Sequence, residues 1–250
     1  MIGDAPATIV GEQMRTAAIL PVKRFEAAKS RLGASVARAP RERLAGAMVG
    51  DVLLALEQTP SVEITIVVTC EPTVLDHAGV DQHVLFVEDS AESGQSDAVA
   101  LGVRRALAGG IERVLCIPGD CPALDPDELE ALLAASVPPQ RSGSLVVIVP
   151  DRHGTGTNGL LLTPPDAIYP SFGPDSCERH RALARGVGAL CRVERPPSLL
   201  LDVDTGDDLD ELKRRLAQTR TERSASLIAS GTRSLLDAPA HATVSPIEIG

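Results

Sequence analysis

Three aspartates in this chain have the residue type and the spacing of a metal site. Asp120 follows a Pro-Gly pair that ends a short apolar run. Asp202 and Asp204 alternate with apolar residues, so an extended backbone would turn both carboxylates to one face. Two such carboxylates repel unless a cation lies between them, and oxygen ligands suit Mg²⁺. We therefore predict a Mg²⁺ site at Asp120, Asp202 and Asp204, although Asp120 taken alone fits a turn residue better.

A basic segment near the N-terminus has the composition of a phosphate site. Four cations fall within nine residues, at Lys23, Arg24, Lys29 and Arg31. Lysine supplies a point charge, and arginine can bind a phosphate through two parallel hydrogen bonds. A solvated charged loop explains this segment equally well when it is taken alone.

The turn-rich loop 88–96 precedes a predicted helix. A loop of this kind can present backbone N–H groups to an anion or a nucleotide, although any strand-to-helix connection resembles it. Gly94, Ser96 and Asp97 are the candidate nucleotide-binding residues.

Two further loops contain small and hydroxyl residues. The stretch 154–157 alternates Gly and Thr, which suits a ligand carboxylate or phosphate, with a tight turn as the alternative. Asp175 and Glu178 have the spacing of a capping box, which would place Ser176 in the first turn of a helix that could hold an anion. His180, farther along this helix, is better explained as a structural residue than as a catalytic one.

These loops must be positioned by alternating strands and helices. Apolar, β-branched runs predict strands, most of them too uniformly apolar to be exposed on one face, at 17–22, 62–69, 84–87, 113–117, 145–149, 159–163 and 199–205. Helical periodicity or capping signals predict helices at 41–56, 97–108, 126–136, 176–185 and 207–216. This alternation predicts an α/β sandwich with a mostly parallel sheet.

The prediction divides the chain of 250 residues into a flexible leader (1–14), one domain (15–218) and a polar tail (219–250) that is disordered or weakly packed. A net charge of −10 and an aromatic content of 2% argue against a nucleic-acid partner. The five cysteines lack paired spacing, which favours free thiols in a reducing compartment. With no membrane span or signal peptide in the sequence, we expect a cytoplasmic protein.

Five motifs in their order resemble one enzyme family. They are PVKRFEAAKSRL (21–32), PGDCPAL (118–124), DRHGTGTN (151–158), FGPDSCERHR (172–181) and DVDT (202–205). Together they resemble the guanylyltransferases of coenzyme F-420 biosynthesis. This resemblance implies a three-layer, Rossmann-like nucleotidyltransferase fold of the nucleotide-diphospho-sugar-transferase type. It also implies an enzyme that joins GMP from GTP to a three-carbon phosphate and releases pyrophosphate.

Carried over by position, the resemblance implies a role for three groups of residues. Asp120, Asp202 and Asp204 would hold Mg²⁺. The carboxylate end of the three-carbon acceptor would be bound by Thr157, Gly173 and Ser176, and phosphates would be met by Lys23, Lys29 and Arg31.

The acceptor expected from the resemblance is phosphoenolpyruvate, with 2-phospho-L-lactate and 3-phospho-D-glycerate as alternatives, and the downstream F-420 transferase as a candidate partner. A related enzyme for a sugar phosphate or molybdopterin would carry a Gly-Gly-x-Ser-x-Arg-Met-Gly signature after the first strand, where this chain has PVKRFEAAKSRL. A nucleotide-binding regulatory protein without catalysis is the third hypothesis. The presence of all three candidate metal acids counts against it.

Overall fold

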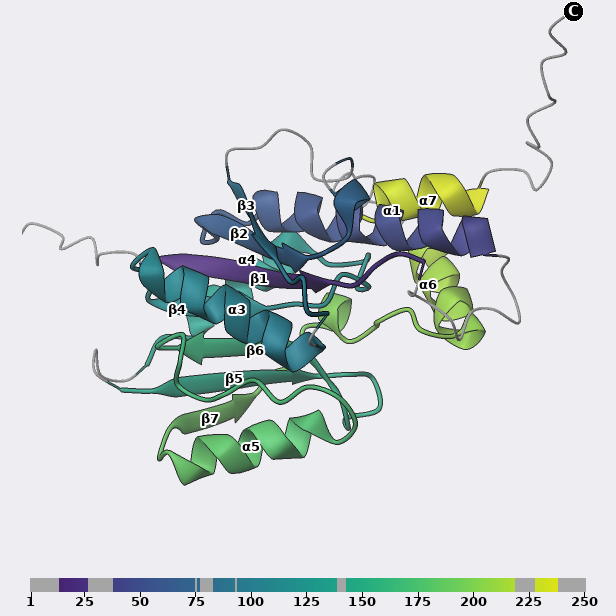
Figure 1. Ribbon diagram of the computed structural model, residues 1–250. Helices are drawn as coiled ribbons and strands as arrows, with labels where there is room; N and C mark the ends of the chain where they lie inside the picture. The colour runs from purple at the N-terminus through teal and green to yellow at the C-terminus, as the bar shows by residue number, and fades with distance from the viewer. Residues whose placement is uncertain are drawn as a thin grey trace, which may run out of the picture.

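The computed structural model describes residues 14–26, 38–74, 76, 83–92, 94–138, 143–218 and 228–237. Its centre is a seven-stranded sheet with the order β3-β2-β1-β4-β6-β5-β7, in which only β6 is antiparallel to its neighbours (Figure 1). The strands are β1 (Thr16–Val22), β2 (Ile64–Thr69), β3 (Val84–Glu88), β4 (Arg113–Cys116), β5 (Leu145–Pro150), β6 (Thr157–Thr163) and β7 (Leu190–Val193).

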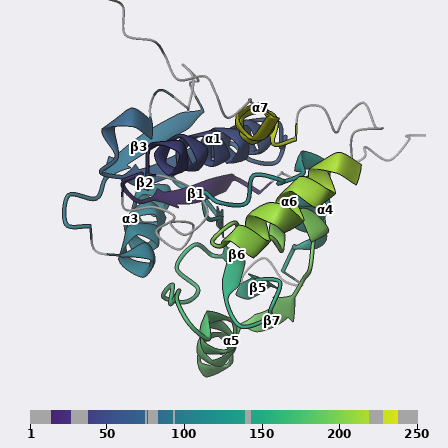
Figure 2. The same ribbon diagram turned by 90° about the vertical axis from the view of Figure 1, so that its right-hand side faces the viewer.

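Helices cover both faces of this sheet. They are α1 (Arg38–Glu57), α3 (Gln95–Ala108), α4 (Pro126–Ala135), α5 (Ser176–Gly186), α6 (Gly206–Gln218) and α7 (Ser230–Asp237), with short 3-10 helices η2 (Pro72–Val74) and η3 (Pro197–Leu199). Successive residues of β1 enter different cores: Ala18 and Leu20 pack with residues of α1 and α4, whereas Ile19 packs with residues of α3. Figure 2 shows α1 and α3 on opposite sides of β1. The predicted three-layer α/β sandwich with a mostly parallel sheet is confirmed.

One predicted strand is wrong and one strand was missed. Residues 199–205 form the end of η3 and an irregular segment instead of a strand. The alternation there arises because Leu201 and Val203 are buried in a third core cluster that includes residues of α1 and α6, apart from the sheet. The missed strand is β7, whose residues are exposed or half-buried and so lack the apolar run of a central strand.

The helix-capping predictions have different outcomes. Asp125 is confirmed as the N-cap of α4, because its carboxylate accepts a hydrogen bond from the Asp127 N–H at 2.9 Å. The capping box of Asp175 and Glu178 is wrong. Asp175 has φ 57°, outside the extended conformation of a capping residue, and its side chain makes no cap hydrogen bond. Glu178 instead pairs with Arg185 at 2.8 Å.

The expectation of a disordered or weakly packed tail does not hold for residues 228–237. Helix α7 lies along α1 in both views (Figures 1 and 2). The buried carboxylate of Asp51 on α1 accepts the N–H groups of Gly231 and Thr232, each at 2.8 Å. The leader up to residue 13, and 219–227 and 238–250 of the tail, lie outside the described residues.

The Asp51→Ala substitution is expected to detach α7. It removes the acceptor of two N–H groups, so the free energy of local opening of α7 should fall by about 1–3 kcal/mol. Hydrogen exchange at Gly231 and Thr232 measures this change. Glu57→Ala, which removes an exposed acid from the same helix α1, is the control and should leave the exchange unchanged. Equal protection in the Asp51→Ala protein would show that the carboxylate does not hold α7.

Among the described residues, no helix combines the length and the apolar character needed to cross a membrane. All five cysteines are free, and Cys116, Cys121 and Cys177 are buried.

Candidate active site

A cleft of about 400 Å³ opens at the carboxyl ends of the parallel strands. The loops after β1, β2, β3 and β4 contribute to it, together with the start of α3. Among the residues that line it are Lys23, Arg24, Glu92, Gly94, Gln95, Gly119, Asp120 and Asp204. Because open α/β sheets bind ligands at the carboxyl ends of their strands, this cleft is the candidate active site.

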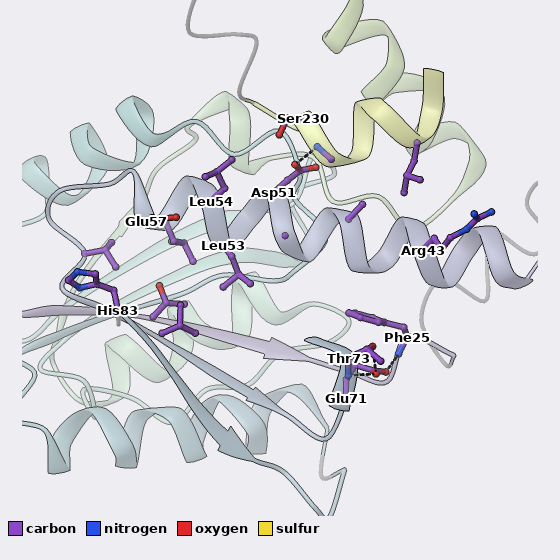
Figure 3. Close-up of a pocket in the computed structure, with 18 of the residues that line it drawn as sticks. Phe25, Arg43, Asp51, Leu53, Leu54, Glu57, Glu71, Thr73, His83 and Ser230 are labelled. Atoms are coloured by element: carbon purple, nitrogen blue, oxygen red, sulfur yellow. Dashed lines mark hydrogen bonds between the residues drawn. The ribbon is translucent and has the colours of Figure 1, made fainter. Parts of the chain in front are cut away.

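A larger cavity, of about 1280 Å³, lies beside α1 (Figure 3). Two of its carboxylates already accept hydrogen bonds from the chain: Asp51 from α7, and Glu71 from the Phe25 N–H at 2.8 Å. Of the predicted site residues that the structure describes, only Arg24 of the basic segment lines this cavity, and it lines the cleft as well. The larger cavity is therefore not the candidate site. The smaller cleft is the candidate because Asp120, Asp204 and Lys23 line it.

The three predicted aspartates are brought together although residues 199–205 are not a strand. Asp120 and Asp204 both line the cleft. Burial raises the pKa of Asp202, and the negative charges of Asp120 and Asp204 raise it further. The Val203 N–H donates to the Asp120 carbonyl at 2.9 Å, which joins the two segments. The close approach of like charges creates a place where a cation would be stabilising.

The donor set fits a metal that is completed by its substrate. Within the described part of the chain, no three His, Cys, Asp or Glu side chains form a ready-made metal group. Mg²⁺ is usually bound by one or two carboxylates, with water and substrate phosphates filling its remaining positions. Asp120 and Asp204 at the cleft supply that number of carboxylates.

Asn158 orients Asp202 and was not predicted. Its side-chain amide donates to Asp202 Oδ1 at 3.2 Å and to the Leu199 carbonyl at 3.1 Å. The amide is buried on β6, where polar groups need partners. Its place directly after Thr157, in a strand that is otherwise mostly apolar, was the signal available in the sequence.

The irregular segment that carries Asp204 is fixed by Asp208, in the first turn of α6. The Asp208 carboxylate accepts the N–H groups of Asp204 at 3.2 Å and Thr205 at 2.7 Å. Its other oxygen pairs with the Arg152 guanidinium at 2.6 Å. This ion pair joins the loop after β5 to the segment that carries two of the aspartates, and no local sequence pattern indicated it.

The Gly-Thr loop is a tight turn for most of its length. The Asp151 carboxylate accepts the N–H groups of Thr155 at 3.0 Å and Gly156 at 2.9 Å. A Cβ at Gly156 would lie 2.6 Å from that carboxylate, so a larger residue there would displace the group that holds the turn. The alternative explanation, a tight turn, therefore applies to residues 154–156. Thr157 is the residue of this loop whose side chain contacts Ser176 and His180.

Thr157 and Ser176 form a buried pair of hydroxyls. Their oxygens lie 3.1 Å apart, and Thr157 Oγ1 also lies 3.1 Å from His180 Nδ1. Gly173, at φ 106°, accepts the Ser176 N–H at 3.1 Å and so connects the preceding loop to α5. The structure thus brings the three predicted acceptor-binding residues together, and adds His180 to them.

Comparison with known proteins identifies the family. The sequence profile described as "Guanylyl transferase CofC like" matches residues 16–223. The chain belongs to this family. It is 51% identical over 208 residues to the phosphoenolpyruvate guanylyltransferase of Conexibacter woesei, which covers 83% of this chain and 91% of the relative. The phosphoenolpyruvate guanylyltransferase of Sphaerobacter thermophilus is 39% identical over 199 residues, covering 80% of this chain and 93% of the relative.

Solved structures agree on the fold of this guanylyl transferase family member. A nucleotide-diphospho-sugar transferase from Desulfovibrio desulfuricans has a TM-score of 0.65 at 18% identity, covering 89% of this chain and 98% of its own. A nucleotidyl transferase from Methanothermobacter thermautotroptrophicus has a TM-score of 0.59, also at 18% identity, covering 84% of this chain and 100% of its own. At such identities the likeness shows the fold alone, and the predicted nucleotidyltransferase fold is confirmed.

The predicted nucleotide loop of this CofC-like chain is connected to the loop before α5. Of its three candidates only Gly94 lines the cleft. Ser96 Oγ accepts the Phe172 N–H at 2.9 Å, and Asp97 accepts the Tyr169 hydroxyl at 2.5 Å. These contacts place the start of α3 beside the loop that leads to Ser176.

The predicted phosphate ligands can be placed only in part. Lys23 is exposed and lines the cleft, whereas Lys29 and Arg31 lie outside the described residues. Arg24, also at the cleft, pairs with Glu92 at 2.6 Å. This exposed pair joins the loop after β1 to the nucleotide loop, and a phosphate could compete with Glu92 for the arginine.

The buried imidazole of His180 should make stability depend on pH. Burial, aided by the nearby Arg179, lowers its pKa from 6.5 to about 4. The unfolded chain therefore binds this proton first as the pH falls. The contribution of His180, up to about 3 kcal/mol, is fully present above pH 6.5 and is lost as the pH falls toward 4. Denaturant unfolding between pH 5 and 7 should show a shallower slope for His180→Asn than for the unsubstituted protein; equal slopes would contradict the shift.

Proposed function

We propose that this protein joins GMP from GTP to phosphoenolpyruvate and releases pyrophosphate, as a cytoplasmic step in coenzyme F-420 biosynthesis. The observation that carries the proposal is the cleft in which Asp120, Asp204 and Lys23 meet the nucleotide loop at the carboxyl ends of the strands. The choice of acceptor is supported by the names of the relatives, at 51% and 39% identity over most of the chain.

The reaction requires two anions to approach each other. A phosphate oxygen of the acceptor attacks the α-phosphorus of GTP, and the bond to the leaving pyrophosphate breaks. Mg²⁺, held by Asp120 and Asp204 with Asp202 beside them, would neutralise the negative charge that gathers during this displacement. In this proposal Asn158 holds Asp202 in orientation, and Lys23 places its ammonium beside the phosphates.

The protein's main task in such a reaction is to position the two reactants. Gly94 and the first turn of α3 would bind the nucleotide, and Thr157, Gly173 and Ser176 the acceptor's carboxylate. The hydrogen bond from the Phe172 N–H to Ser96 supports this division, because it connects the two binding loops directly. We expect Lys29 and Arg31, in the segment after Lys23, to contact phosphates as well.

A coupled assay tests the proposal. Purified full-length protein is incubated with GTP, Mg²⁺ and one acceptor in turn: phosphoenolpyruvate, 2-phospho-L-lactate or 3-phospho-D-glycerate. Released pyrophosphate is measured, and the product is identified by its mass, with and without the downstream F-420 transferase and its own acceptor. We expect release only with phosphoenolpyruvate and only with Mg²⁺. Release with 2-phospho-L-lactate alone would favour that acceptor, and release without any acceptor would contradict the proposal.

A further inference from the structure

We propose that His180 is a positioning residue that sets the direction of hydrogen bonding at Thr157 and Ser176, so that one hydroxyl hydrogen remains to be donated to the acceptor's carboxylate. The inference deepens the proposed function and rests on it. It begins from the contacts of a side chain that is 0% exposed.

The tautomer of His180 follows from its backbone partner. The N–H of Ser171 lies 2.9 Å from His180 Nε2. A backbone N–H can only donate, so Nε2 must be the ring nitrogen without a hydrogen. In a neutral imidazole the other nitrogen, Nδ1, then carries the hydrogen. Nδ1–H therefore donates to Thr157 Oγ1, 3.1 Å away.

Because His180 donates to Thr157, one hydroxyl hydrogen of the Thr157–Ser176 pair is not used within the group. The two hydroxyls of Thr157 and Ser176 hold two hydrogens, and the contact between their oxygens at 3.1 Å uses one of them. The contact to His180 uses none, because the imidazole is the donor. One hydroxyl hydrogen is left for a further acceptor, whichever of the two hydroxyls donates to the other.

The opposite tautomer would remove this donor. With its hydrogen on Nε2, His180 would face the Ser171 N–H with a second hydrogen, and its bare Nδ1 would have to accept from Thr157. Both hydroxyl hydrogens would then be consumed within the group. Burial and the charge of Arg179, which lower the pKa of His180 to about 4, also keep the doubly protonated ring from forming near neutral pH.

The surroundings hold the ring and its partner in place. Arg179 donates to the carbonyls of Ser171 at 3.0 Å and Phe172 at 2.9 Å, which fixes the segment that presents the Ser171 N–H. The ring of Phe172 meets the imidazole edge-on, with centroids 5.2 Å apart. A carboxylate only accepts hydrogen bonds, so a hydroxyl hydrogen that this group does not itself consume suits it.

Two variants of His180 distinguish the effect of its hydrogen bond to Thr157 from the effect of its packing. His180→Asn places an amide N–H near the position of Nδ1 and keeps the donor to Thr157. His180→Leu keeps an apolar side chain of similar size and removes the donor. We expect His180→Leu to raise the KM for phosphoenolpyruvate at least about 10-fold, a loss of about one charge-assisted hydrogen bond. The KM for GTP should stay within about twofold, and His180→Asn should recover most of the loss.

The matched control is His83→Asn, at the amino end of β3 and away from the cleft. It should leave both KM values unchanged. If His180→Leu changed kcat and both KM values alike, or if His180→Asn behaved as His180→Leu, the residue would only support packing and the inference would be overturned.

A second measurement does not depend on the variants folding or on activity. NMR correlation of the imidazole nitrogens with the ring C–H protons reports which nitrogen of His180 carries the hydrogen. We expect hydrogen on Nδ1 at pH 7, and hydrogen on Nε2 would overturn the inference. If the unsubstituted protein released no pyrophosphate with phosphoenolpyruvate, the proposed function would fail, while the tautomer would still be measured on its own.

Discussion

Asp120→Asn and Asp204→Asn are each expected to lower kcat by about 10³-fold or more. Both side chains line the cleft, and asparagine keeps their shape while removing the charge that would hold Mg²⁺. Without that charge the metal binds weakly and the two anionic reactants repel each other, so the barrier rises by about 4 kcal/mol for a 10³-fold loss. The measurement is pyrophosphate release at saturating GTP and acceptor over a range of Mg²⁺ concentrations.

The control for this experiment is Asp125→Asn, the same substitution five residues beyond Asp120. Asp125 caps α4, and asparagine is an equally good capping residue, so stability and kcat should stay within about twofold of the starting protein. Wild-type turnover in the Asp120→Asn or Asp204→Asn protein would disprove their assignment as metal ligands. A loss that high Mg²⁺ fully restores would assign them to metal affinity alone.

The central strands could be predicted from sequence because each is buried on both faces. β4 and β5 are buried along their whole length, and such a strand can contain almost only apolar residues. The ends of these runs then located the loops, and with them Asp120. Residues 199–205 were mistaken for a strand for a related reason: Leu201 and Val203 face a core, but one that includes α6 and not the sheet. An alternating pattern shows which residues are buried, but not against which element they pack.

The parts of the site that could not be predicted depend on partners distant in the chain. Asn158 donates to Asp202, 44 residues away, and Arg152 pairs with Asp208. The apolar strand around Asn158 indicates that its amide is buried, but nothing in the local sequence identifies Asp202 as its partner or Asp208 as the partner of Arg152. His180 was interpreted from the sequence as a structural residue, and its direction of donation depends on the Ser171 N–H, which only the folded loop presents. Local patterns thus indicated candidate loops for the site, and tertiary contacts determine how their side chains are oriented.

Asp208→Ala should weaken both the fold and the reaction, although Asp208 does not line the cleft. Asp208 is 6% exposed, and its carboxylate holds the N–H groups of Asp204 and Thr205 and the Arg152 guanidinium. Loss of these two hydrogen bonds and of a largely buried ion pair should lower the free energy of unfolding by about 2–4 kcal/mol. Because the segment that carries Asp204 would shift, kcat should fall about 10–100-fold. Denaturant unfolding and pyrophosphate release measure the two effects.

Asp207→Ala is the control for Asp208→Ala, because it removes a negative charge from the same turn of α6 and leaves the contacts of Asp208 in place. Both acids lie in the first turn of α6, where negative charge favours the helix, but Asp207 is exposed. Its removal should cost less than about 1 kcal/mol and leave kcat within about twofold. Arg152→Ala should fall between the two, because it breaks the ion pair and leaves the N–H groups of Asp204 and Thr205 bound to Asp208. Equal kcat values for Asp208→Ala and Asp207→Ala would show that Asp204 keeps its position without this carboxylate. The observed ranking therefore decides whether the geometry of the aspartates is set by the segment itself or by its attachment to α6 and the loop after β5.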